Sequence, residues 1–115
     1  MFIKVLKSKI HRAAVTQTNL EYTGSITIDQ ELTDAVALRE QELVLVANLN
    51  NGTRHETYVQ LGKKGSGVIC LNGAAARLAC VGDRVIIMSF GYYGTDEQIP
   101  PAKVVMVDEK NQIIS

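Results

Sequence analysis

Residues 21–29 read Glu-Tyr-Thr-Gly-Ser-Ile-Thr-Ile-Asp, and the rest of the chain is best understood from this stretch. The β-branched run from Ser25 to Ile28 predicts a short strand. Asp29 follows directly and has the side chain of a good N-cap, so we expect a short helix from Gln30 to Leu38. The stretch therefore predicts a strand that turns into a helix, with the Gly24–Ser25 peptide bond at the start of the strand.

The Gly24–Ser25 dipeptide permits a reaction of the backbone itself. Glycine has no Cβ to block attack on its carbonyl group, and it reaches backbone conformations closed to other residues. The hydroxyl of Ser25 can attack the Gly24 carbonyl and convert the amide into an ester. Elimination would leave a dehydroalanine at position 25, and water would convert that residue to a pyruvoyl group with release of ammonia. Taken alone, a Gly-Ser pair before a strand is more typical of an ordinary turn.

The remaining pattern is mostly that of short strands joined by turns. Asn51-Gly52 predicts a type I′ hairpin turn. Glycine followed by three alanines at 73–76 predicts a close-packed turn that opens a short helix. The segment 91–101 is expected to be a polar loop, and 43–47 to be an apolar strand buried on nearly both faces. Further strands are expected at 2–6, 11–17, 53–61, 68–71, 84–90 and 103–107. About seven strands with one or two short helices predict a single mainly β domain over residues 1–115, in the form of a barrel.

Charge and composition exclude several classes of function. Twelve basic and twelve acidic residues leave a net charge of zero, which argues against nucleic acid or an acidic membrane surface as a partner. No tryptophan is present and aromatic residues are few, so an oligonucleotide-binding barrel with a base-stacking platform is not expected. No apolar run is long enough to span a membrane, and the N-terminus lacks the features of a signal peptide. Cys70 and Cys80 have no metal-ligand spacing, which predicts reduced core thiols in a cytoplasmic protein.

Four clusters of polar or small residues interrupt the apolar framework, at 9–12, 22–25, 54–58 and 72–76. Alternation along a strand places Lys9 and His11 on one face. It also places Arg54 and Tyr58 on one face of their strand, with Thr57 on the other. A regular strand therefore would not direct both Thr57 and Tyr58 into one pocket, unless a bulge or a subunit boundary intervenes.

These clusters form ordered motifs: L-x-x-K-I-H-R at 6–12, Y-x-G-S-I-x-I-D at 22–29, N-G-x-R-x-x-T-Y at 51–58 and N-G-A-A-A at 72–76. Their sequence and spacing resemble the pyruvoyl-dependent aspartate 1-decarboxylases over essentially the whole chain. The resemblance implies a double-psi β-barrel, assembled as a homotetramer with active sites between subunits. It implies self-cleavage between Gly24 and Ser25, which gives a β chain of residues 1–24 and an α chain of residues 25–115. The pathway implied is β-alanine synthesis for pantothenate and coenzyme A.

The chemistry implied by this resemblance centres on position 25. The ketone forms an imine with the amine of L-aspartate and accepts the electrons released as the α-carboxylate leaves as CO₂, much as pyridoxal does. The pyruvoyl group derived from Ser25 is then the cofactor, with no metal and no pyridoxal phosphate. Arg54 is expected to hold the second carboxylate, because its planar guanidinium matches a carboxylate bidentately. Tyr58 is similar to the family's proton donor, and Thr57 to the residue whose hydroxyl bonds the Gly24 carbonyl and promotes the acyl shift.

The resemblance assigns supporting roles to the other motif residues. Lys9 would help to hold a carboxylate, and His11 and Tyr22 would assist processing or position substrate and water. Asn72 would donate a hydrogen bond at position 25. The small residues that follow it, Gly73, Ala74 and Ala75, would let backbone amides approach the substrate closely. A separate maturation factor that speeds the cleavage is compatible with this interpretation.

Two positions and two alternative functions complete the prediction. Ala47 stands where family members often carry a bulky aromatic residue beside the substrate, and His55, which is outside the motifs, is expected to face outward. One alternative is a double-psi barrel that never cleaves and acts as a binding module. The other is a pyruvoyl enzyme for a different amino acid, because Arg54 alone does not distinguish aspartate from glutamate.

Overall fold

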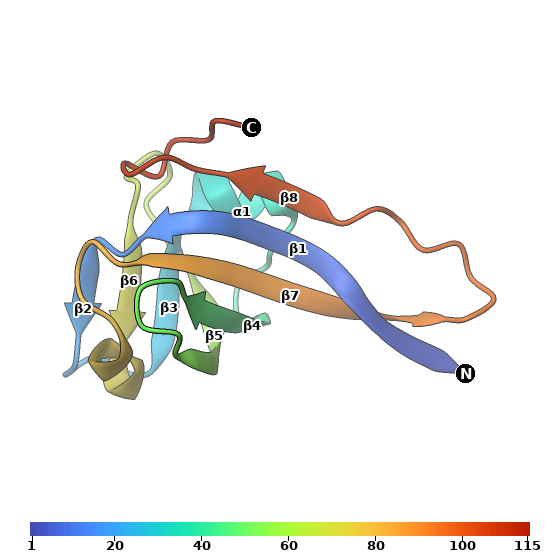
Figure 1. The fold of residues 1–115 in the computed structure, drawn as a ribbon, viewed down its shortest axis with the longest axis horizontal. Coiled ribbons are helices and arrows are strands. Elements are labelled where there is room, and N and C mark those ends of the chain that lie inside the picture. The colour runs from blue at the N-terminus through green and yellow to red at the C-terminus, as the bar shows by residue number, and fades with distance from the viewer.

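A computed structural model of the chain describes residues 1–115 and consists mainly of β-strands (Figure 1). The elements follow in the order β1 (Phe2–Ala14), β2 (Gln17–Asn19), β3 (Ser25–Asp29), α1 (Gln30–Val36), β4 (Leu43–Asn48), β5 (Arg54–Gly62), β6 (Ile69–Asn72), the 3₁₀ helix η1 (Gly73–Leu78), β7 (Arg84–Gly94) and β8 (Lys103–Met106). All eight strands belong to one sheet, in the order β2-β6-β3-β5-β4-β7-β1-β8.

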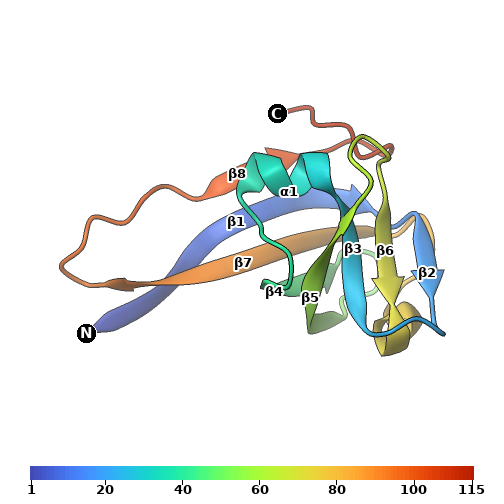
Figure 2. The same cartoon turned by 180° about the vertical axis from the view of Figure 1, so that it is seen from behind.

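The sheet closes on itself because β1 and β2 are nearly continuous in sequence. β1 pairs with β7, and β2 pairs with β6 at the other end of the strand order. Val15 and Thr16 join the two strands, and their amides donate to the carbonyl oxygens of Asp83 and Ile69, each at 2.8 Å. Parallel and antiparallel pairs alternate around β3, which lies between β5 and β6 (Figure 2). This closed mixed sheet confirms the predicted mainly β class, a double-psi β-barrel with one or two short helices.

The barrel interior is filled by branched aliphatic side chains from every part of the sheet. Ile26 and Ile28 of β3, Val59 of β5 and Ile69 of β6 are fully buried there. Because strand residues alternate between two faces, Ser25, Thr27 and Asp29 of β3 point away from this core. The start of β3 thus presents its hydroxyl residue on the face opposite the hydrophobic interior.

Asp29 joins the end of β3 to α1 as the sequence predicts. Its carboxylate accepts from the backbone amide of Glu31 at 2.8 Å, which caps the helix. The same carboxylate accepts from the amides of Gly65 and Gly67, at 2.9 and 2.8 Å. The helix is shorter than expected, because Ala37 adopts a left-handed conformation with φ of 60° and ends it after Val36.

The first expected pair of strands is a single long strand. β1 runs from Phe2 to Ala14 and pairs with β7 along nearly its whole length. Two irregularities interrupt the register, between Leu6 and Ser8 and between Ile10 and Ala13, and they bend the strand without ending it. β7 correspondingly continues through 91–94, where the sequence predicted a loop, because these residues pair with the first residues of β1. The two strands form an arm that extends beyond the barrel (Figure 1).

Three local predictions were wrong. β4 is buried along one face, at Val44 and Val46, but only in part along the other, where Ala47 is buried and Leu43 is exposed. The hairpin that follows forms as predicted, but its turn is not type I′, because only Gly52 of the two expected residues has a positive φ. Cys70 is a buried free thiol as expected, whereas Cys80 is exposed, since it lies in the turn between η1 and β7.

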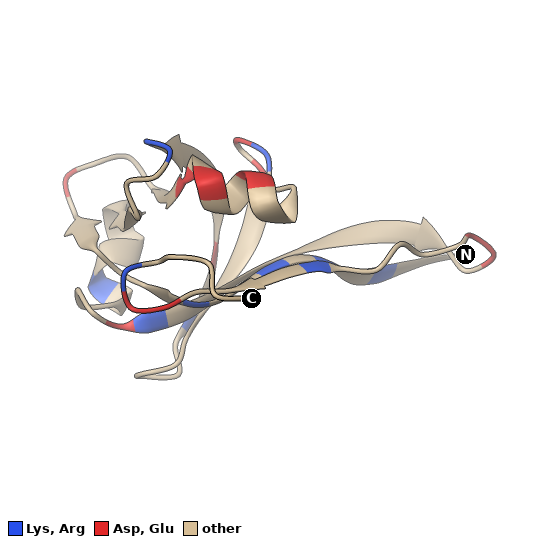
Figure 3. Cartoon of the chain, turned by 90° about the horizontal axis from the view of Figure 1, so that it is seen from above, with Lys and Arg blue, Asp and Glu red and all other residues tan.

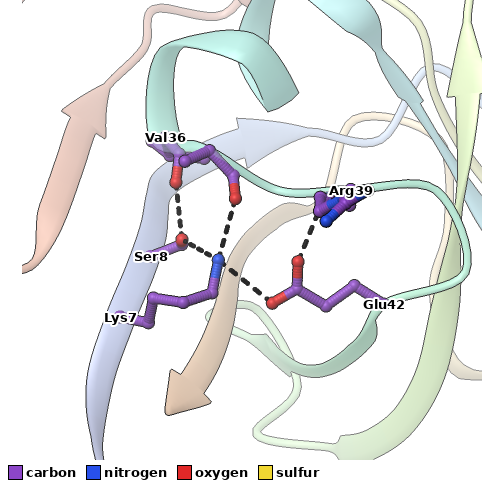
Figure 4. Close-up of polar contacts among 6 residues, drawn as sticks. Lys7, Ser8, Val36, Arg39 and Glu42 are labelled. Carbon is purple, nitrogen blue, oxygen red and sulfur yellow. Dashed lines mark hydrogen bonds and ion pairs between the residues drawn. The ribbon is translucent and has the colours of Figure 1, made fainter.

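A polar network fastens the C-terminal end of α1 to the barrel (Figure 4). Lys7 Nζ donates to the carbonyl oxygen of Ala37 at 2.8 Å and forms an ion pair with Glu42 at 3.1 Å. The buried hydroxyl of Ser8 donates to the carbonyl oxygen of Val36. These contacts satisfy carbonyl groups that the helix itself leaves unpaired.

Charges of both signs are dispersed over the molecule (Figure 3). Acidic positions on α1 include Glu31 and Asp34, and basic positions are spread along other elements. None of the helices has the length and apolar character needed to cross a membrane.

Candidate active site

The hydroxyl of Ser25 is completely buried and held by two side chains. The Asn72 amide nitrogen donates to Ser25 Oγ at 2.8 Å, and Ser25 Oγ donates to Gln60 Oε1 at 2.9 Å. Antiparallel pairing of Ser25 with Asn72 between β3 and β6 brings the first pair together. Parallel pairing of Thr27 with Gln60 between β3 and β5 brings the second. The two strands that flank β3 therefore each provide one partner for the hydroxyl group.

Gly73 lies directly against Gly24. A Cβ atom at position 73 would be 2.8 Å from Gly24 Cα and 3.0 Å from its nitrogen, which is closer than real Cβ contacts. Gly73 also has a φ of 71°, a conformation that favours glycine. A Cβ at Gly24, by contrast, would meet nothing within 4 Å. Residue 73 must be glycine for the chain to pass this close to the Gly24–Ser25 junction.

A cavity of about 470 Å³ lies at this junction and contains many of the expected residues. Gly24, Thr57, Asn72, Ala74 and Ala75 line it, as the motifs predict. The other lining residues are His55, Glu56 and Leu78. The structure therefore brings together the residues expected to act on the Gly24 carbonyl and those expected to shape the pocket.

His55 corrects the prediction that it faces outward. The ring is half-buried and lines the cavity, and its buried Nε2 has no hydrogen-bond partner. Burial lowers the pKa of His55 below its ordinary value, because the charged imidazolium is poorly solvated there. His55 and Thr57 are two residues apart and therefore lie on the same face of β5, which directs the His55 side chain toward the cavity.

Arg54 and Tyr58 lie on the other face of β5 and are not among the residues that line this cavity. Both are exposed, and Tyr58 as a residue retains 40% of its accessible surface. Thr57 lies between them and is directed toward the cavity, as alternation predicts. Tyr22 is also exposed, although its backbone oxygen lies beside Gly73. Within one chain, the expected proton donor and carboxylate-binding residue thus stay outside the Gly24 cavity.

Lys9 and His11 line a second, smaller pocket of about 270 Å³, with Val104, Met106 and Ser115. They share one face of β1, as predicted. His11 Nδ1 is buried without a hydrogen-bond partner. Burial and then the neighbouring charges of Lys9 and Arg12 lower the pKa of His11. No group of three or more His, Cys, Asp or Glu side chains lies close enough together to hold a metal ion.

Comparison with known proteins assigns these features to a family. The family model described as aspartate decarboxylase matches residues 1–114. A relative from Kosmotoga olearia, named aspartate 1-decarboxylase, is 61% identical over 99% of this chain and 98% of its own length. Relatives of the same name from Pseudothermotoga lettingae and Caldicellulosiruptor bescii are 59% and 57% identical, over 96% and 99% of this chain and 95% and 90% of theirs. The chain belongs to the aspartate decarboxylase family.

Among solved structures, the chain is similar to the rationally designed mkDPBB_sym1 protein. The TM-score is 0.48 and the sequence identity 18%, over 76% of this chain and 96% of the designed one. Membership in the aspartate decarboxylase family itself confirms the resemblance that the four motifs indicate, and it confirms that the chain is a decarboxylase.

Two residues of this aspartate decarboxylase site were missed by sequence reasoning. Gln60 bonds Ser25 Oγ, and Cys70 Sγ lies 3.2 Å from Asn72 Oδ1. A signal for Gln60 was present, because it shares a strand face with Arg54 and Tyr58 by simple alternation. It was not recognised because the parallel register of β3 and β5, which places it beside Ser25, is a tertiary feature. Ala47 pairs with Arg54 across β4 and β5.

Proposed function

We propose that this chain decarboxylates L-aspartate at its α-carboxylate to give β-alanine and CO₂, and so supplies β-alanine for pantothenate and coenzyme A synthesis. The observation that carries the proposal is the buried Ser25 hydroxyl, hydrogen-bonded from both sides beside Gly24. Family membership over residues 1–114 supports the substrate and the reaction. The functional unit is a single domain of residues 1–115.

The catalytic group is made by cleavage of the chain between Gly24 and Ser25. Ser25 Oγ forms a bond to the Gly24 carbonyl carbon, the C–N bond breaks, and the hydroxyl proton is transferred to the Ser25 nitrogen. Loss of the Ser25 α-proton and breakage of the Cβ–O bond then release the Gly24 carboxylate. Water hydrolyses the remaining dehydroalanine to a ketone and ammonia. The products are a β chain of residues 1–24 and an α chain of residues 25–115.

The residues around the junction fit this chemistry. Thr57 lines the same cavity as Gly24, so its hydroxyl is available to stabilise negative charge on the Gly24 oxygen during the acyl shift. One such donor contributes a factor on the order of 10²–10³ in rate. The absence of a side chain at Gly73 lets its backbone pack directly against Gly24.

The pyruvoyl group at position 25 would supply an electrophilic ketone that accepts electrons from the departing carboxylate. Asn72 already donates to the atom at the end of the residue 25 side chain, and after maturation its amide is placed to orient the group and its substrate. Ala74 and Ala75 keep the wall of the cavity close to the backbone, which leaves room for a small amino acid. No metal and no pyridoxal phosphate is required.

The carboxylate-binding residues are proposed to reach the site from a neighbouring subunit. Arg54, Tyr58, Lys9 and His11 do not line the Gly24 cavity of their own chain. A homotetramer with active sites between subunits would bring them against the cavity of another copy. Arg54 would then bind the β-carboxylate of aspartate, Lys9 would assist it, and Tyr58 would donate a proton to the α-carbon. His11 and Tyr22 would position substrate and water.

The decisive experiment combines denaturing mass spectrometry with an assay for β-alanine. The purified protein should give two fragments, residues 1–24 and residues 25–115, with the longer one blocked at its N-terminus. Reduction with a hydride donor in the presence of L-aspartate should attach the amine to the longer fragment. A continuous chain without activity would instead favour the non-cleaving binding module. Turnover of L-glutamate in preference to L-aspartate would reassign the substrate.

Three further expectations concern the cell. We place the enzyme in the cytoplasm, where Cys70 and Cys80 would stay reduced. Neither nucleic acid nor a membrane is expected as a partner, because charges of both signs are dispersed and balanced. A maturation factor that accelerates cleavage would be recognised by faster fragment formation in cell extract than in buffer.

A further inference from the structure

Gln60 is the one direct contact of the Ser25 hydroxyl that has no role in the proposed function. Its Oε1 accepts the hydroxyl hydrogen at 2.9 Å, and the contact is part-buried. Gln60 lies on β5, three residues after Thr57, but on the opposite face of that strand. The two faces of β5 therefore each serve one of the two reacting groups. Thr57 lies in the cavity beside the Gly24 carbonyl group, and Gln60 bonds the hydroxyl of Ser25.

The direction of these hydrogen bonds is set by a chain of neighbours. The Cys70 thiol is placed to donate to Asn72 Oδ1 at 3.2 Å, which turns the nitrogen of the Asn72 amide toward β3. That nitrogen donates to Thr27 Oγ1 at 3.0 Å and to Ser25 Oγ at 2.8 Å. Since Ser25 already accepts from Asn72, its own proton is free to be donated, and Gln60 presents a carbonyl oxygen to receive it.

The two hydrogen bonds leave only one lone pair of Ser25 Oγ free. A serine hydroxyl has one hydrogen and two lone pairs. The hydrogen is donated to Gln60 Oε1 and the Asn72 amide donates to one lone pair, so a single lone pair remains. Attack on the Gly24 carbonyl needs a free lone pair on this oxygen, and both other directions around the atom are already filled.

We propose that Gln60 is a positioning residue for self-cleavage, which orients the Ser25 hydroxyl so that its free lone pair is available to the Gly24 carbonyl. This proposal rests on the proposed self-cleavage. In the step concerned, the Oγ–C bond forms, the C–N bond breaks and the hydroxyl proton ends on the Ser25 nitrogen. Gln60 does not take the proton, because an amide oxygen is too weak a base; it fixes the rotation of the hydroxyl group before attack.

The test measures cleavage of newly made precursor. Wild-type chain and variants are produced by cell-free synthesis, and the fraction cleaved is followed over time by denaturing mass spectrometry. Gln60→Leu keeps the approximate size of the side chain but removes the acceptor. We expect its cleavage to be about tenfold slower, which corresponds to about 1.4 kcal/mol in the barrier. Gln17→Leu is the matched control, because Gln17 is an exposed strand glutamine that makes no side-chain hydrogen bond.

Gln60→Glu separates positioning from a merely structural role. It keeps the shape of glutamine and restores an acceptor, so cleavage should be rescued relative to Gln60→Leu. A carboxylate accepts a stronger hydrogen bond than an amide, so the rate should rise with pH as the introduced carboxyl group deprotonates. The wild-type chain should lack that step. If Gln60→Leu fails to fold, as judged by circular dichroism, the pH profile of Gln60→Glu decides alone.

Each contrary outcome has a distinct meaning. An uncleaved wild-type chain would overturn self-cleavage and, with it, this role for Gln60. A wild-type chain that cleaves at the same rate as folded Gln60→Leu would overturn only the role of Gln60. The same conclusion follows if Gln60→Glu shows no pH dependence beyond that of the wild-type chain.

Discussion

The surroundings of Ser25 and those of Lys9 and His11 differ in how completely one chain builds them. Ser25 is fully buried, and Asn72 and Gln60 both bond its hydroxyl. Lys9 and His11 of β1 line a pocket with residues of β8, and His11 Nδ1 is buried with no partner. The Ser25 hydroxyl therefore has its hydrogen-bond partners within its own chain, whereas the buried ring nitrogen of His11 has none. Processing should thus depend on contacts inside one chain, and substrate binding on contacts still to be made.

The largest expected effect comes from removing the hydroxyl itself. Ser25→Ala should abolish both cleavage and decarboxylation, because no oxygen remains to attack Gly24 and no ketone can form. Intact mass should show one continuous chain of 115 residues, and β-alanine should be undetectable. Normal decarboxylation by this variant would show that the buried hydroxyl region is not the source of the catalytic group.

Gly73→Ala tests whether cleavage needs the close approach of the residue 73 backbone to Gly24. The added Cβ would lie 2.8 Å from Gly24 Cα, so the junction must shift. We expect cleavage to slow by tenfold or more and the free energy of unfolding to fall, with about 1–3 kcal/mol of the fall due to the positive φ. Timed intact-mass measurements and urea denaturation report the two effects.

Gly52→Ala is the control for backbone strain. Gly52 has a similar φ of 76°, but a Cβ there would meet nothing within 4 Å. It should lose comparable stability and still cleave at the wild-type rate. Equal cleavage by the two alanine variants would mean that contact with Gly24 is unimportant.

Arg54→Ala tests substrate binding separately from self-cleavage. Arg54 is exposed and lies outside the Gly24 cavity, so cleavage should proceed normally. Loss of a charge-assisted contact with the second carboxylate costs about 2 kcal/mol, so kcat/KM for L-aspartate should fall about 30-fold. Arg39→Ala, at another exposed arginine, should leave both measurements unchanged. Slow cleavage in Arg54→Ala would mean that processing and substrate binding are not separated as proposed.

Sequence reasoning recovered the parts of this molecule that local patterns encode. The cap at Asp29, the strand at Ser25 and the short helix after Asn72 follow from propensity and alternation, and the opposite facing of Thr57 and Tyr58 follows from the period of a strand. The errors concern features that depend on contacts between distant parts of the chain.

Residues 91–94 form a strand because β1 pairs with them, and His55 turns inward because a cavity lies on its face of β5. Gln60 was missed for the same reason, since only the register of β3 against β5 places it beside Ser25.

The smallest expected effect concerns His55, which lines the cavity beside Gly24 and whose Nε2 has no hydrogen-bond partner. Burial lowers its folded-state pKa below the unfolded value of about 6.5. Between those two values the unfolded chain binds more protons, so stability should fall as the pH drops through that window. In the uncut Ser25→Ala background, the urea midpoint should therefore decrease between pH 7.5 and 5.5, and adding His55→Leu should reduce the decrease. Part of the slope should persist, because the pKa of His11 is also lowered. An unchanged decrease in the His55→Leu variant would mean that the ring is solvated, and that the Gly24 cavity has more access to water than its lining residues indicate.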